Sequence, residues 1–163
     1  MVLTVDPTSP AEFDFLIGSW SVTHRRLKHR LTGSTEWDTF SGSCVVWKIL
    51  GGFGNVDDNV LELPTGTYRA TSLRSYNATT TTWSIWWLDA RNPDRLDVPV
   101  VGRFEDGVGT FFANDRLAGK PIVVRFRWTL LAPDSPHWEQ AFSSDDGRTW
   151  ETNWTMDFKR KPY

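Results

Sequence analysis

The segment from Trp20 to Lys28 contains side chains that could transfer protons or hold an anion. If this segment is extended, its side chains alternate between two faces, and His24 and Arg26 share the face of Trp20. An imidazole titrates near neutral pH and can act as a general acid or base, and a guanidinium can hold an anionic group. A charge inside an apolar wall needs a partner or a ligand. This face therefore predicts a polar site. The alternative is that the segment turns outward after Val22, so that its basic residues lie in solvent.

An acidic partner for this face is available in GGFGNVDDNVLEL, residues 51–63. Asn55, Asp57 and Asn59 occupy alternate positions and would share one face of a strand. We predict Asp57 as the inward acid that pairs with His24 or Arg26. The candidate catalytic residues are therefore His24 and Asp57, and the candidate ligand contacts include Arg26 and Asn55.

The sequence contains ten tryptophans, and most of them fall in segments of alternating pattern. A hairpin centred on SDDGRT, residues 144–149, would pair Trp138, Gln140 and Phe142 with Trp154, Thr152 and Trp150. We expect the interior to be lined by Trp87, Phe126, Trp128, Trp138, Gln140, Phe142, Trp150, Thr152, Trp154, Met156 and Phe158. Of these, Trp87, Trp128, Trp138, Gln140 and Trp154 are the further candidate ligand contacts. The alternative is that the rings only fill a core.

The elements that must position these side chains are strands. Turn signals recur every ten to fifteen residues after Trp20, and the segments between them are rich in β-branched and aromatic residues. We predict an all-β fold, an up-and-down antiparallel β-barrel of about ten strands. A barrel of that width leaves room inside for a small ligand.

Before the first strand, residues 9–17 carry helix signals. Ser9 suits an N-cap, Pro10 the first helical position and Glu12 a capping box, and Gly18 could end the helix. We predict a short N-terminal helix of about two turns, with Phe13 and Leu16 on its apolar side. Such a helix is unstable alone, so we expect it to pack against the barrel.

Composition limits the partners. With 163 residues, we expect a single domain over 1–163. The formal net charge of -2, without runs of like charge, argues against nucleic acid or a membrane surface as partner. Cys44 is the only cysteine, the N-terminus lacks a signal-peptide pattern, and no metal-ligand spacing is present, so we expect a cytoplasmic protein without metal or cofactor.

Several motifs support a resemblance. Gly18-Ser19-Trp20 after a short apolar segment resembles the start of the calycin barrels, which include the lipocalins and fatty-acid-binding proteins. FDFLIGSW, VVGRFEDGVGTFF and WEQAFSSDDGRTW are similar to a bacterial family of small calycin-like domains of unassigned function. The resemblance implies that the N-terminal helix closes one end of the barrel, and that Arg160, or its neighbour Lys159, lies across Trp20.

Three functions follow as hypotheses. The first is binding of a small apolar or aromatic molecule inside the barrel. The second is a cavity enzyme, such as an isomerase or cyclase of small-molecule metabolism, that uses His24 with Asp57 or Arg26. The third is haem binding, because one calycin branch uses a histidine near the end of the chain, and His137 lies there. The sequence also leaves open whether the protein forms a homodimer.

Overall fold

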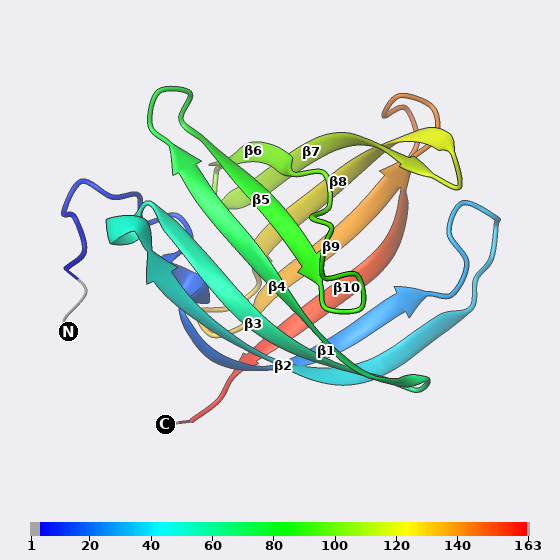
Figure 1. The fold of residues 1–163 in the computed structure, drawn as a ribbon, viewed down its shortest axis with the longest axis horizontal. Coiled ribbons are helices and arrows are strands. Elements are labelled where there is room, and N and C mark those ends of the chain that lie inside the picture. Colours follow the sequence, from blue (N-terminus) through cyan, green and yellow to red (C-terminus); the bar gives the residue numbers. More distant parts are fainter. Residues whose placement is uncertain (1–3, 163) are drawn as a thin grey trace.

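Residues 4–162 of the computed structural model form one closed barrel of ten antiparallel strands (Figure 1). Each strand pairs with its neighbours in the sequence, and β1 closes the ring by pairing with β10. This confirms the all-β, up-and-down arrangement. The strands are β1 Gly18–Leu27, β2 Trp37–Ile49, β3 Gly54–Leu63, β4 Gly66–Asn77, β5 Thr82–Asp89, β6 Val100–Glu105, β7 Val108–Leu117, β8 Lys120–Leu130, β9 Pro136–Ser143 and β10 Glu151–Arg160.

The inner face of β1 follows the alternation expected from the sequence. Trp20, Val22 and His24 are buried, and the residues between them are exposed. The strand does not turn outward after Val22, so His24 lies in the barrel interior. Lys28 lies beyond the end of β1 and forms ion pairs with Glu36 and Asp38.

The predicted N-terminal helix over residues 9–17 is wrong. Only a single 3-10 turn, η1, forms at Asp14–Leu16. The carboxylate of Glu12 accepts a hydrogen bond from the indole Nε1 of Trp83 at 2.8 Å and caps no helix. A segment this short gains little from helical hydrogen bonds, so contacts with the barrel decide its conformation.

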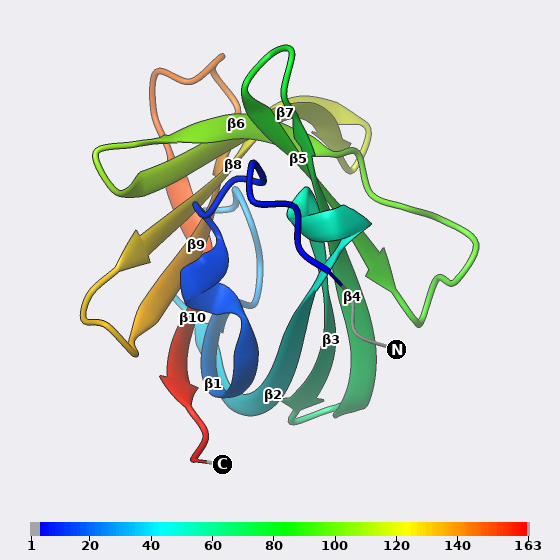
Figure 2. The same ribbon diagram turned by 90° about the vertical axis from the view of Figure 1, so that its left-hand side faces the viewer.

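This segment nevertheless packs into one end of the barrel. Figure 2 views that end, and the blue chain lies across it. Phe13 and Leu16 are buried, and the ring of Phe13 meets Trp83 and Phe104 edge to face at 4.9 Å. We call this the plugged end.

Trp20 and Arg160 lie where the calycin resemblance implies. Trp20 is fully buried, and its Nε1 donates to the Leu16 carbonyl at 2.7 Å. The Arg160 guanidinium lies 4.1 Å above the indole and donates to the carbonyls of Phe15 and Ile17. Gly18 has a φ of +128°, and a Cβ there would meet the Arg160 guanidinium at 2.5 Å, so this turn requires glycine.

The register expected for the last hairpin is wrong. Phe142 pairs with Glu151 in place of Trp150, and a bulge at Asn153 then shifts the register by one more residue. As a result Trp154 pairs with Gln140, and Trp138 pairs with Met156. The bulge buries both Asn153 and Trp154, and Asn153 accepts a hydrogen bond from Gln140 at 2.8 Å. Trp150 precedes β10 and lies outside the barrel, where its ring packs under the Arg125 guanidinium at 4.4 Å.

The weakest junction of the barrel is between β5 and β6, which share three register pairs, from Trp83 to Ile85. The long loop over residues 90–99 covers the rest of β5 through an isolated bridge between Leu88 and Leu96. In residues 4–162 no helix is long and apolar enough to cross a membrane.

Candidate functional site

The barrel encloses a cavity of about 240 Å³. One wall is aromatic and comes from β5, β8, β9 and β10. It consists of Trp87, Phe126, Trp128, Trp138, Phe142, Trp154 and Phe158. Neighbouring rings pack edge to face. The ring centroid of Trp154 lies 5.9 Å from that of Trp87 and 5.4 Å from that of Trp138.

The facing wall is polar and comes from β3 and β4, which lie across the ring of strands from β8 and β9. Asp57 and Arg74 form a buried ion pair at 2.7 Å. The second Asp57 oxygen accepts hydrogen bonds from the Ser72 amide at 2.6 Å and the Asn59 side chain at 2.5 Å. These contacts hold both charges inside the barrel, although the buried Nε of Arg74 has no hydrogen-bond partner among residues 4–162.

Arg74 joins the polar wall to the plugged end. Its Nη1 donates to Asn55 at 2.8 Å, and its guanidinium lies 5.5 Å from the ring of Phe13 and 5.6 Å from Trp128. Cation–π contacts of this kind stabilise a desolvated guanidinium. At the plugged end of the cavity, the positive charge of Arg74 is therefore already paired and is not available to a ligand.

The opposite end of the cavity, which we call the mouth, carries more charged residues. Arg26 donates to the Tyr68 hydroxyl at 3.2 Å, and its guanidinium lies 5.1 Å from the ring of Trp154. Arg91 pairs with Asp89 at 2.7 Å and stacks 3.6 Å above the Tyr68 ring. The mouth therefore presents guanidinium groups beside aromatic faces.

Further groups at the mouth are Arg30, Asp97 and Asp115. Burial and the nearby Arg26 cation lower the pKa of Arg30 below its ordinary value. Burial and the nearby Asp115 carboxylate raise the pKa of Asp97. Arg30 and Asp115 are half-buried and Asp97 is exposed, so water reaches this end of the cavity.

His24 is buried in the wall and does not line the cavity. Its ring stacks on Phe40 at 4.7 Å, and its Nδ1 accepts a hydrogen bond from the Trp154 indole at 3.1 Å. Burial, with a smaller effect of Arg26, lowers the pKa of His24 from 6.5 to about 4. The imidazole is therefore neutral near pH 7, and it positions Trp154.

The structure brings most of the predicted site residues to one cavity. Its lining includes Arg26, Asp57, Trp87, Trp128, Trp138, Gln140 and Trp154. His24 and Asn55 lie behind this lining, where Asn55 holds Arg74. The expected partnership of Asp57 with His24 or Arg26 is not formed, because Arg74 pairs with Asp57 instead. The catalytic roles of His24 and Asp57 stay predictions.

Four cavity-lining residues were not predicted from the sequence: Arg30, Tyr68, Arg74 and Arg91. The alternation in YRATSLRSY, residues 68–76, carried a usable signal, because it places Tyr68, Ser72 and Arg74 on one face of β4. Arg30 and Arg91 lie in loops after β1 and β5, where no strand alternation assigns a direction. Within residues 4–162, no cluster of three or more His, Cys, Asp or Glu side chains could hold a metal ion.

Comparisons with known proteins support the fold. No protein-family model matches the chain, and no curated protein sequence matches it. The solved structure of the S-type phycobiliprotein lyase from Guillardia theta is similar, with a TM-score of 0.52 and 9% sequence identity over 93% of this chain and 91% of that chain. At this identity the likeness shows a shared barrel fold. The finer resemblance to one family of small bacterial domains gains no support from these comparisons.

Proposed function

We propose that this barrel binds a small molecule with an apolar, aromatic body in the cavity. The observation that carries the proposal is the wall of seven aromatic rings around an unfilled space of about 240 Å³. Rings that served only as core would pack against one another and leave no such space. Aromatic walls with a few fixed polar groups are typical of small-molecule sites.

A cavity enzyme is the second candidate, since the similar barrel of Guillardia theta is named a lyase. Binding without turnover is favoured because the imidazole of His24 lies behind the lining and is neutral at pH 7. Asp57 is held by Arg74, Ser72 and Asn59. General acid–base catalysis needs a group that reaches the substrate and titrates near the working pH.

The test is a titration with N-phenyl-1-naphthylamine, an uncharged aromatic probe. We expect saturable, one-site quenching of tryptophan fluorescence, because several indoles line the cavity. Trp87→Leu removes one ring from the wall and should weaken binding roughly tenfold, which corresponds to about 1.4 kcal/mol. The control is Trp37→Leu, whose indole packs under Arg25, outside the cavity lining.

The proposal fails if the probe does not bind, or if its quenching rises linearly without saturation. Equal losses of affinity in Trp87→Leu and Trp37→Leu would also contradict it. Both tryptophans would then act through stability alone.

A further inference from the structure

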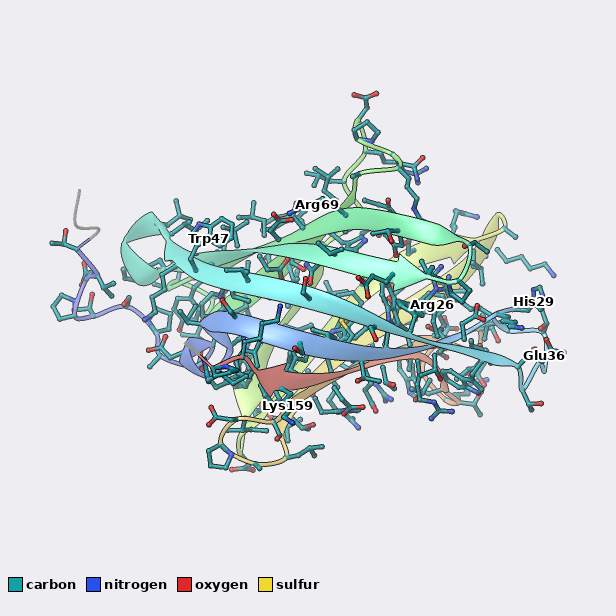
Figure 3. The ribbon with its side chains drawn as sticks, turned by 90° about the horizontal axis from the view of Figure 1, so that it is seen from below. Arg26, His29, Glu36, Trp47, Arg69 and Lys159 are labelled. Atoms are coloured by element: carbon teal, nitrogen blue, oxygen red, sulfur yellow. The ribbon has the colours of Figure 1, made fainter. Side chains whose placement is uncertain are left out.

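We infer that the ligand also carries one anionic group, a carboxylate, sulfonate or phosphate, which Arg26, Arg30 and Tyr68 bind at the mouth of the cavity. This inference rests on the proposed function and names the chemical class of the ligand. Figure 3 shows Arg26 toward the end of β1 that leads to the β1–β2 loop, in which His29 and Glu36 are labelled.

The charges around the cavity do not all have partners. Four arginines and four aspartates line it. Arg74 forms an ion pair with Asp57, and Arg91 forms one with Asp89. In the part of the chain that the structure describes, neither Arg26 nor Arg30 has a carboxylate within 4.0 Å. Two cations therefore lie at the mouth without a directly paired carboxylate, and Glu151, which lies near Arg30, accepts a hydrogen bond from the Leu31 amide instead.

Arg26 is held in position by uncharged groups. Its Nη1 donates to the Tyr68 hydroxyl at 3.2 Å, and its guanidinium lies 5.1 Å from the Trp154 ring. The Tyr68 oxygen accepts this bond, so its own proton remains available to a ligand. The guanidinium keeps further N–H donors. Arg26 and Tyr68 together form a preorganised set of donors beside an aromatic ring.

Arg30 lies four residues further along, in the loop after β1, and also lines the cavity. Its Nε is buried, and no acceptor for it exists among residues 4–162. Its guanidinium lies 5.9 Å from the Phe142 ring, and it interacts unfavourably with the Arg26 charge. A bound anion would satisfy the Nε donor and remove this repulsion.

Two acids at the mouth, Asp97 and Asp115, also lack an ion-pair partner within the described part of the chain. They favour a cationic ligand less than Arg26 and Arg30 favour an anionic one. Asp97 is exposed and Asp115 is half-buried, so water can hydrate these carboxylates. A guanidinium keeps its proton at all ordinary pH values. The Nε of Arg30, by contrast, is buried without an acceptor among residues 4–162, so the positive side of the mouth is the side that lacks a partner.

The test compares two probes that differ by one anionic group: N-phenyl-1-naphthylamine and its 8-sulfonate, 8-anilinonaphthalene-1-sulfonate. Without a cation at the site, the sulfonate should bind less tightly, because it loses hydration. We expect the sulfonate to bind at least roughly tenfold more tightly than the neutral probe, because a charge-assisted hydrogen bond contributes a binding free energy of that size. Raising the salt concentration should weaken sulfonate binding and leave the neutral probe unaffected.

Arg26→Met and Arg30→Met should each weaken sulfonate binding roughly tenfold and change binding of the neutral probe less than about threefold. The control is Arg25→Met, which removes the same charge from the neighbouring position on the outer face of β1, where Arg25 is exposed. Sulfonate binding should be unchanged in this variant. Retained binding of the neutral probe shows that each variant is folded.

The outcomes separate the two proposals. If neither probe binds, the proposed function fails. If the neutral probe binds and the sulfonate binds equally or less tightly, the function stands and the anion inference is overturned. If Arg25→Met weakens sulfonate binding as much as Arg26→Met, the effect is one of overall charge, and the assignment to the mouth is overturned.

Discussion

His24 illustrates at the scale of single residues how burial changes the chemistry of a side chain. The same imidazole that suggested acid–base catalysis in the sequence lies between Phe40 and Trp154. Burial first, and then the Arg26 charge, lower its pKa to about 4. At neutral pH it accepts one hydrogen bond and carries no charge. Its effect on stability is therefore expected to depend on pH.

In the folded protein the pKa of His24 is about 4, and in the unfolded chain it is the ordinary 6.5. Between these values the unfolded chain binds more protons, so the free energy of unfolding falls as the pH is lowered from 6.5 to 4. The loss should reach about 3 kcal/mol. His24→Gln, which keeps an acceptor for Trp154, should abolish this part of the pH dependence in urea denaturation curves.

His29→Gln is the matched control, because His29 is exposed in the β1–β2 loop. It should preserve the loss of stability between pH 6.5 and 4. If His24→Gln and wild type lose stability in parallel over this range, His24 is not buried as a neutral group.

At the scale of elements, the N-terminal segment shows that a barrel can be plugged without a helix. The 3-10 turn at Asp14–Leu16 supplies the Leu16 carbonyl to Trp20, and the carbonyls of Phe15 and Ile17 to Arg160. Trp20 and Arg160 are also register partners on β1 and β10. One tryptophan therefore joins the plugging segment to the junction that closes the barrel.

Trp20→Ala should destabilise the protein by about 3 to 5 kcal/mol, because it removes a fully buried indole and leaves a cavity. Trp47→Ala is the control. This tryptophan is 43% exposed on β2, and its loss should cost less than about 1 kcal/mol. Chemical denaturation monitored by circular dichroism measures both values. Similar costs for the two substitutions would contradict the role assigned to Trp20.

At the scale of the whole molecule, the ring of strands is uneven. The β7 and β8 pair extends over nine register positions, whereas β5 and β6 share three. The loop over residues 90–99 continues from this weak junction and supplies Asp97 and Val98 to the cavity lining. The barrel should therefore open locally at this junction before it unfolds elsewhere.

Hydrogen exchange measured by NMR tests this expectation. Backbone amides of Val100 to Gly102 should exchange faster than those of Val124 to Phe126, which pair with β7 on one side and with β9 on the other. Fewer ladder bonds need to break for the first group to reach water. Equal protection in the two groups would mean that β5 and β6 open only with the rest of the barrel.

The sequence by itself predicted the ten-strand barrel, its aromatic interior and the inward direction of His24 and Asp57. Strand alternation and turn residues are local signals, and each inner face was assigned from its own strand. The same logic placed Trp87, Trp128, Trp138 and Trp154 around the interior, where they line the cavity.

Partnerships were decided only by the tertiary structure. Asp57 meets Arg74, not His24, because register pairs β3 with β4 and brings the two charges to the same interior. The bulge at Asn153 shifted the pairing of Trp154. Glu12, which was expected to cap a helix, accepts a hydrogen bond from Trp83 instead. Alternation states which face a side chain occupies. It does not state which residue of another strand or loop lies opposite, because that depends on register, bulges and burial across the closed barrel.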